Sequence, residues 1–396
     1  MITPVMPTYA RTEMGFVKGE GSWVIDEDGN KYLDAGAGIA VSVLGHAHPR
    51  LVQALTSQAQ ALWHTSNLYR IPNQERLAEL LVDNTFADTV FFNNSGAEAV
   101  ETAVKMARRH WHACGSPERN EIITLEHAFH GRTLGMISAA PSPKLTDGFA
   151  PLLPGFRQVV AGDLDEIASA VGENTAAILV EPILGEGGII PLSDSYLKGL
   201  RKLCNDHGVL LILDEIQCGM GRTGKLFAHQ WAGIAPDIMA IAKGIGGGFP
   251  LGACLATEKA ASGMTVGTHG STYGGNPLAC AVGCEVLKIV SDEDFLQVVR
   301  RTAGQLRQGL EAIVAGHPNV FEDVRGSGLM LGLKCRSDNM NMEVVSAGYD
   351  QRILLVPAAD NVVRILPPLN ISPFEVATLI QGINRSAQSL DSKQDA

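Results

Sequence analysis

Short apolar runs of strand length alternate with amphipathic stretches along most of this chain. Glu121–Leu125, Ala176–Val180 and Val209–Asp214 are such runs, whereas Asn73–Thr85 and Ala99–Ala113 have the apolar spacing of helices. Strands that read as continuous apolar runs are typical of parallel sheets with helices on both faces. The pattern therefore predicts an α/β fold with a mainly parallel sheet.

The two ends of the chain carry different patterns. Residues Gly21–Asp34 predict a β-hairpin, because Asp28-Gly29-Asn30 supplies turn residues between two short apolar strands. From about Phe295 an amphipathic helix, two strand-like runs and a last helix predict a smaller α+β domain, and only the tail SLDSKQDA is expected to be disordered. We expect an N-terminal segment (1–45) that packs with the small domain, a large domain (46–285) and the small domain itself (286–396).

Composition narrows the possible partners. The chain has 396 residues, 45% of them hydrophobic and 18% charged, and a net charge of −11. An acidic balance argues against nucleic acid or an anionic membrane as a partner, since no basic surplus is left to neutralise phosphates. We see no signal peptide and no apolar segment of membrane-spanning length. Seven scattered cysteines without a C-x-x-C pair suggest a reducing, cytoplasmic location.

Two charged residues end neighbouring apolar runs. Asp214 ends the run VLLIL, and Lys243 follows the run IMAIA and precedes Gly244 and three further glycines. A lysine that is partly desolvated beside a cleft can serve as a Schiff-base lysine. Because open α/β sheets bind ligands at the carboxyl ends of their strands, Asp214 is expected to face the same cleft. The pair suggests a lysine imine with a pyridinium cofactor whose ring nitrogen Asp214 keeps protonated. A solvated loop lysine and a capping aspartate are the plainer interpretation.

Two further loops offer groups for such a cofactor. The strand TVFF leads through Asn93-Asn94-Ser95-Gly96-Ala97 into a helix, and free N–H groups at a helix start favour phosphate; a simple N-cap by Ser95 is the alternative. After Glu121–Leu125, Phe129 can stack on a flat ring and Arg132 can bind a carboxylate through two hydrogen bonds. Arg364 lies in the strand-like run VVRIL, where it needs a partner if it points inward.

Two other ligands, a nucleotide and a metal ion, are suggested by parts of the sequence. The segment GMGRTGK resembles both a dinucleotide fingerprint and a phosphate loop, but Leu226 stands where a phosphate loop needs a hydroxyl for magnesium. His46, His48, His127 and His130 lack the further ligands of a metal site, so we expect no metal.

Six motifs together resemble the class III aminotransferases, which are pyridoxal 5′-phosphate (PLP) enzymes of fold type I, the aspartate-aminotransferase-like fold. They occur in order along nearly the whole chain: NNSGAEAVETAVKMAR, HAFHGRT, EPILGEGG, LILDEIQCGMGRTG, AKGIGGGFPLGA and GSTYGGNPLA. The resemblance implies a cytoplasmic homodimer with shared active sites. Within the class, GIAVSVLGHAHP and the short chain are most similar to enzymes of arginine biosynthesis that act on N2-acetyl-L-ornithine with 2-oxoglutarate as the amino acceptor.

The resemblance also implies roles for individual residues. Lys243 becomes the imine lysine and proton shuttle, and Asp214 the partner of the pyridinium nitrogen. Phe129 is then expected to stack on the cofactor ring, and Ser95, Gly96 and Ala97 to form the phosphate loop. Glu215, Ile216 and Gln217 are expected near the ring, and Thr272 comes from the second subunit.

The same resemblance divides substrate binding between two states. Arg132 and Ser271 are expected to contact acetylornithine, and Arg364 to receive the α-carboxylate of glutamate. Glu186 is expected to pair with Arg364 and mask it while the ω-amino substrate is bound. Ile39 stands where ornithine aminotransferases carry a tyrosine, which disfavours free ornithine. Succinylornithine, ornithine, 4-aminobutyrate and succinyldiaminopimelate remain alternative donors, and a PLP aminomutase is a further alternative reaction.

Overall fold

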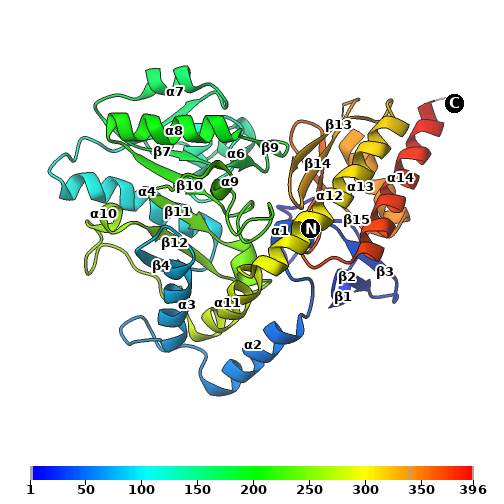
Figure 1. The fold of residues 1–396 in the computed structure, drawn as a ribbon, viewed down its shortest axis with the longest axis horizontal. Coiled ribbons are helices and arrows are strands. Elements are labelled where there is room, and N and C mark those ends of the chain that lie inside the picture. The colour runs from blue at the N-terminus through cyan, green and yellow to red at the C-terminus, as the bar shows by residue number, and fades with distance from the viewer. Residues whose placement is uncertain (1–2, 339, 395–396) are drawn as a thin grey trace.

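A seven-stranded sheet forms the centre of the larger lobe in the computed structural model, which describes residues 3–338 and 340–394 (Figure 1). β12 runs antiparallel to both of its neighbours, and the other pairs of this sheet are parallel. The predicted α/β fold with a mainly parallel sheet is therefore confirmed. The strands in spatial order are β4 (Thr89–Asn93), β12 (Gly252–Ala256), β11 (Ile238–Ile241), β10 (Leu210–Asp214), β7 (Thr175–Val180), β5 (Glu121–Leu125) and β6 (Phe156–Val159).

Helices cover both faces of this sheet because successive side chains of a strand point to opposite sides. Ile122 of β5 packs in one core with α4 (Gly96–Ala113), whereas Ile123 packs in another with α7 (Leu164–Ala170) and α8 (Asp194–His207). The other short elements of this lobe are α2 (Pro49–Ala61), α3 (Pro72–Asp83), α5 (Leu134–Ala139), α6 (Pro143–Thr146), β8 (Ile183–Leu184), β9 (Ile190–Pro191), α9 (His229–Ala232), η1 (Lys243–Gly246), α10 (Glu258–Ala261) and α11 (Pro277–Val290).

The second lobe is built from the two ends of the chain (Figure 1). An antiparallel sheet in the order β13-β14-β17-β16 lies beside three helices, and a second sheet, β1-β2-β3-β15, joins the N-terminal strands to the C-terminal part through the parallel pair β3–β15. The predicted hairpin is present as β2 and β3. The elements are β1 (Phe16–Glu20), β2 (Trp23–Asp26), β3 (Lys31–Asp34), α1 (Ala37–Ala40), α12 (Glu293–Gly316), β13 (Phe321–Ser327), β14 (Met330–Cys335), α13 (Met340–Asp350), β15 (Ile353–Leu354), β16 (Val356–Ala358), β17 (Val362–Ile365) and α14 (Pro373–Gln394).

Three local expectations differ from the structure. The helix expected from Ala99 begins at Gly96, because Ser95 caps it by accepting the N–H of Glu98. The strand β12 was not predicted, since its small residues GACLA carry little strand signal. The tail expected to be disordered continues α14 as far as Gln394, and the last two residues lie outside the described ones.

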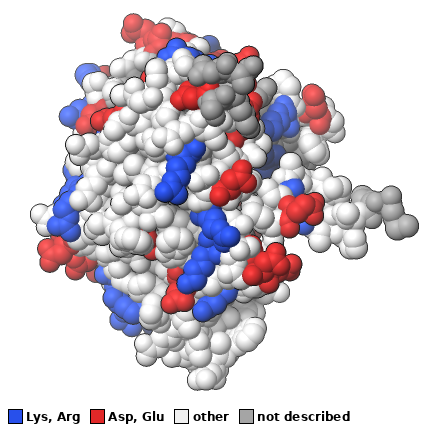
Figure 2. Space-filling model, turned by 90° about the vertical axis from the view of Figure 1, so that its right-hand side faces the viewer, with Lys and Arg blue, Asp and Glu red and all other residues white. Residues whose placement is uncertain are grey.

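The surface and the described helices bear on possible partners. On the face that Figure 2 shows, basic and acidic side chains lie interspersed among uncharged ones. Within residues 3–338 and 340–394, no helix combines the length and apolarity that crossing a membrane requires. The same part of the chain holds no group of three or more histidine, cysteine or acidic residues placed to bind a metal ion.

The GMGRTGK segment is buried between the two lobes. Arg222 is fully buried, and its guanidinium donates to the carbonyl oxygens of Leu329 and Pro367 in the smaller lobe. A side chain committed in this way is not available to a nucleotide phosphate. The segment serves to join the lobes.

Candidate active site

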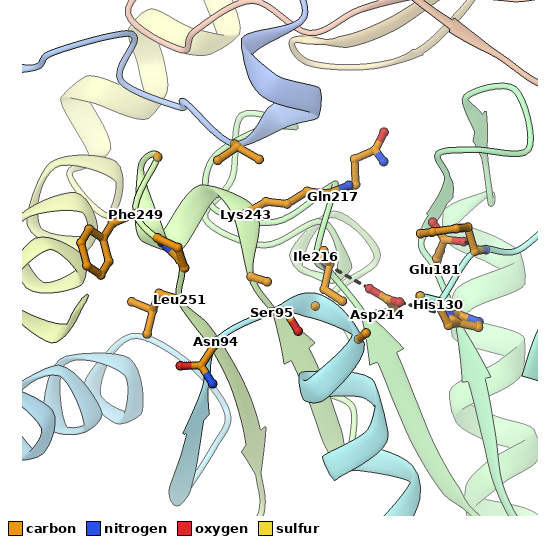
Figure 3. A pocket seen from close by; sticks show the side chains of 18 residues that line it. Asn94, Ser95, His130, Glu181, Asp214, Ile216, Gln217, Lys243, Phe249 and Leu251 are labelled. Carbon is orange, nitrogen blue, oxygen red and sulfur yellow. Dashed lines mark hydrogen bonds and ion pairs between the residues drawn. The ribbon is translucent and has the colours of Figure 1, made fainter. Parts of the chain in front are cut away.

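Four neighbouring strands bring polar side chains to one edge of the large sheet. β5, β7, β10 and β11 are parallel and adjacent, and the chain after each of them, or its last residue, supplies His130, Glu181, Asp214 and Lys243. All four line a cavity of about 350 Å³ (Figure 3), which lies in the usual range of ligand pockets. The other lining residues are Val41, Asn94, Ser95, Gly96, Ala97, Phe129, Gly131, Ile216, Gln217, Ala242, Gly248, Phe249, Pro250 and Leu251.

Lys243 opens the 3₁₀ turn that follows β11. Its φ of 46° lies in the left-handed region, which is unfavourable for a residue with a side chain and is found most often at functional sites. Burial lowers the pKa of the Lys243 ammonium; the carboxylate of Glu186 opposes that shift and the charge of Arg364 adds to it. A lowered pKa increases the neutral fraction, so Lys243 can accept a proton.

Asp214 is buried and held by two hydrogen bonds. Its Oδ2 lies 2.8 Å from His130 Nδ1, and its Oδ1 accepts the backbone N–H of Ile216 at 3.1 Å. Burial lowers the pKa of His130, but the hydrogen bond and the charge of Asp214 outweigh it, so that the pKa is raised overall. This arrangement fixes the direction of the Asp214 carboxylate.

The start of α4 also lines the cavity, through Ser95, Gly96 and Ala97. The first N–H groups of a helix have no acceptor within the helix, so those of Gly96 and Ala97 are available to an anion. A Cβ atom on Gly96 would lie 2.9 Å from Ile216 Cδ1, so a larger residue here would require the Ile216 side chain to shift. The N-cap by Ser95 and the predicted anion site are thus compatible.

Phe129 and Arg132 follow β5, as the sequence predicts. Phe129 lines the cavity, and the guanidinium carbon of Arg132 lies 5.5 Å from the centre of its ring. Arg132 itself is exposed and does not line the cavity. The pair presents a flat apolar surface with a cation beside it.

Glu186 and Arg364 form an ion pair next to the cavity. Both guanidinium terminal nitrogens of Arg364 donate to the carboxylate of Glu186, and one of them also donates to Gln217 Oε1 at 3.4 Å. Arg364 is buried, whereas 36% of the Glu186 side chain is exposed. Gln217 lines the cavity, so it connects the pair to the site.

Besides Arg132, Glu186 and Arg364, four further predicted site residues lie outside the cavity. The carboxylate of Glu215 turns away and accepts the N–H groups of Ala228 and His229 and the Nδ1 of His229, which does not fit the cofactor contact expected of it. Ser271 lies near the cavity, where its Oγ accepts a hydrogen bond from Asn94 at 3.4 Å. Thr272 lies in an exposed loop, and Ile39 packs against an apolar cluster beside Ile183 and Ala358.

Ile39 belongs to an unusual turn. Ala37, Gly38, Ile39 and Ala40 all have φ between 46° and 65°, so this stretch is a single left-handed turn and not an ordinary α-helix. L-residues avoid that conformation. The turn leads directly into Val41, which lines the cavity.

Several lining residues were not assigned from the sequence. Glu181 could have been found, because it ends an apolar run in the same way as Asp214. His130 was considered as a possible metal ligand, and its hydrogen bond to Asp214 depends on how two loops pack. Phe249, Pro250 and Leu251 follow a glycine run that carries no periodic signal.

Comparisons with known proteins agree along the whole chain. The sequence model of the family described as Aminotransferase class-III matches residues 6–386. An acetylornithine aminotransferase of Rhodobacter capsulatus is 59% identical over 393 residues, which cover 99% of this chain and 100% of that protein.

Solved structures give the same result. The N-acetylornithine aminotransferase of Stenotrophomonas maltophilia K279a has a TM-score of 0.86 and 38% identity, covering 97% of this chain and 98% of its own. The ornithine aminotransferase of Toxoplasma gondii, with partial occupancy of PLP at its active site, has a TM-score of 0.95 and 33% identity, covering 99% and 94%.

Proposed function

This chain belongs to the class III aminotransferases, and from that premise we propose that it transfers the ω-amino group of N2-acetyl-L-ornithine to 2-oxoglutarate. The products are N-acetylglutamate 5-semialdehyde and L-glutamate, and the pathway is arginine biosynthesis. The observation that carries the proposal is the pairing of buried Lys243 and Asp214 on one cavity at neighbouring strand ends. The donor is chosen because the matching acetylornithine aminotransferase is 59% identical over 393 residues.

The cofactor is PLP, and the residues of the cavity fit it. Gly96 and Ala97 offer N–H groups for the phosphate, Phe129 offers a ring for stacking, and Asp214 offers a negative charge for the pyridinium nitrogen. When bound, PLP supplies an electron sink that stabilises negative charge at the substrate carbon. Glu215 is removed from the contacts proposed on sequence grounds, because its carboxylate binds the start of α9.

The protein supplies the proton transfers. Burial favours the neutral form of Lys243 Nζ, which can therefore take a proton from the substrate carbon that bears the amino group. Lys243 then donates this proton to the carbon on the other side of the transferred nitrogen. Asp214, oriented by His130, provides a carboxylate on the same cavity. Burial of both groups keeps water away from the reacting atoms, which strengthens these interactions.

The Glu186–Arg364 pair separates the two substrates. Acetylornithine carries no carboxylate beside its reacting amine, so Arg364 stays neutralised by Glu186 when it binds. Glutamate does carry one, and it takes the place of Glu186 on the guanidinium. Because Glu186 is partly exposed and Arg364 is buried, Glu186 is the member that moves. Arg132 and Ser271 contact acetylornithine at the mouth of the cavity.

The active unit is a homodimer. Large apolar side chains of the α2–α3 connection are exposed, among them Trp63, Leu68 and Tyr69, and exposed contiguous apolar surface marks interaction sites. Asn67 in this connection donates to the carbonyl oxygens of Ser271 and Gly274, which ties it to the loop that carries Thr272. We assign the patch to a second copy of the chain, with Thr272 reaching the phosphate in the other subunit's cavity. The location is cytoplasmic, in keeping with seven free cysteines.

A steady-state assay tests the donor. Purified protein with PLP and 2-oxoglutarate is given N-acetylornithine, succinylornithine, ornithine or 4-aminobutyrate in parallel, and glutamate is measured. The highest kcat/KM is expected with N-acetylornithine. Free ornithine is the second candidate, because the ornithine aminotransferase of Toxoplasma gondii has a TM-score of 0.95; a higher kcat/KM with ornithine would favour it. Turnover without 2-oxoglutarate would indicate an aminomutase.

A further inference from the structure

One buried carboxylate joins two loops of the active site. Glu181 Oε1 accepts the backbone N–H of Phe129 at 2.8 Å, and Glu181 Oε2 accepts the backbone N–H of Gly185 at 3.2 Å. Glu181 is 5% exposed and lies on the cavity beside His130 and Asp214 (Figure 3). Each oxygen of the carboxyl group thus holds the backbone of a different loop. The loop after β5 is therefore fastened to the turn after β8.

The same two loops are packed without spare room. A Cβ atom on Gly187 would lie 2.6 Å from the carbonyl oxygen of His127, and one on Gly185 would lie 2.7 Å from Gln217 Cδ. With no room for a side chain at either glycine, a shift of one loop is passed to its neighbour, because protein interiors have low compressibility. The turn after β8 thus takes its position from the loop after β5 and from Gln217.

The residue after Gly185 is the movable half of the ion pair. Glu186 binds Arg364 with its carboxylate, and its carbonyl oxygen accepts the N–H of Ala359 at 3.0 Å. Its backbone is therefore held on one side by the smaller lobe and on the other by the tie from Glu181 to Gly185. Its side chain alone is free to leave the guanidinium.

We propose that Glu181 is a positioning residue that fixes the backbone of the turn after β8, so that the Glu186 carboxylate rests on Arg364 and masks it. This inference rests on the proposed function, because masking matters only if the site accepts both an ω-amine and glutamate. Without the tie, the turn gains freedom and Glu186 covers Arg364 for a smaller fraction of the time. Glutamate then competes better for the guanidinium.

The substitution Glu181→Gln tests the tie with little change in volume. An amide has one acceptor oxygen, so it can keep only one of the two backbone hydrogen bonds and turns an NH₂ group toward the other N–H. Each half-reaction of the holoenzyme gives a second-order rate constant, one with glutamate and one with N-acetylornithine. We expect the ratio of the glutamate constant to the N-acetylornithine constant to rise about tenfold in this variant. Glu181→Asp keeps the charge but is too short to reach both loops, so it should raise the ratio as well.

Hydrogen exchange gives a readout that does not depend on activity. The amide of Gly185 should exchange faster in Glu181→Gln than in the wild-type apoprotein. Glu166→Gln is the matched control, since Glu166 Oε1 also accepts a backbone N–H, that of Val160 at 3.1 Å, outside the cavity. It should leave both the ratio and the exchange of Gly185 unchanged.

Three results would overturn the inference. The first is equal slowing of both half-reactions by Glu181→Gln, and the second is exchange of the Gly185 amide at the wild-type rate in that variant. The third is a wild-type ratio of the glutamate and N-acetylornithine rate constants in Glu181→Asp, which would assign the effect to charge alone. If wild-type protein fails to react with N-acetylornithine, the proposed function fails instead, and the exchange of Gly185 still decides whether the tie exists.

Discussion

The guanidinium of Arg364 binds the carboxylate of Glu186, with Nη2 of Arg364 3.3 Å from Oε2 of Glu186. This contact joins a strand of the smaller lobe to a loop of the larger one, at the edge of the cavity that holds Lys243. Arg364 is buried, so an α-carboxylate can reach it only by replacing Glu186. In the proposed function, this pair lets one site accept two different amino donors.

Removal of Arg364 should affect the two half-reactions unequally. In Arg364→Ala, we expect kcat/KM for glutamate to fall roughly 10- to 100-fold, since hydrogen bonds to a charged group are lost. The acetylornithine half-reaction should change much less. Stopped-flow absorbance of each half-reaction measures both. Arg336→Ala is the control, because Arg336 is exposed in the same lobe and donates to the carbonyl oxygen of Pro318 outside the cavity. Equal losses in both half-reactions would remove Arg364 from this role.

Asp214→Asn keeps the shape of the side chain and removes its charge. We expect kcat to fall about 100-fold or more, as for other charge-stabilising groups at reacting centres. The pKa of His130 should also fall, because Asp214 is the partner that raises it, and NMR titration of that ring detects the change. Asp237→Asn removes a carboxylate that binds Arg201 and lies away from the cavity. Comparable activities of the two variants would argue against an electrostatic role for Asp214.

Stability should depend on pH through Glu181. Burial, together with the charge of Asp214, raises the pKa of Glu181 to about 7 from an ordinary value of 4.5. Between these values the folded state binds more protons than the unfolded chain, so the free energy of unfolding falls as pH rises from about 4.5 to 7. His130, whose pKa is also raised, acts in the same direction but is present in both proteins. Urea unfolding of wild type and Glu181→Gln across this range should give a shallower slope in the variant. Parallel slopes would contradict the raised pKa.

Thr272 should act across the dimer. In Thr272→Ala we expect a several-fold weaker affinity for PLP, by loss of one hydrogen bond to a charged phosphate. Thr265→Ala alters an exposed threonine nearby and should have no effect. Fluorescence titration gives the affinities, and sedimentation velocity gives the oligomeric state. A monomer with full PLP affinity would refute the shared site.

Sequence patterns located the strand ends more reliably than the contacts between them. Lys243 and Asp214 could be placed because each follows a buried apolar run, and parallel strands bring such positions to one edge. The left-handed turn at Ala37–Ala40 could not be foreseen, since alanine and isoleucine normally avoid positive φ and tertiary packing imposes it here. The direction of Glu215 was equally hidden. Adjacent residues at a strand end point to opposite sides, and only the position of α9 shows which side holds the cavity.

The absorption spectrum of the purified protein with PLP, before and after N-acetylornithine is added without any oxo acid, tests the central claim most directly. After unbound PLP is removed, we expect a yellow band at longer wavelength than that of free PLP. This band should be absent in Lys243→Ala and present in Lys225→Ala, whose lysine contacts Gln230 and Trp231 and does not line the cavity. N-Acetylornithine should bleach the band of the wild-type protein, and 2-oxoglutarate should restore it. A shifted band that N-acetylornithine leaves unchanged would contradict the proposed donor. The lack of this shifted band after incubation with PLP would contradict the assignment of Lys243 and of the cofactor.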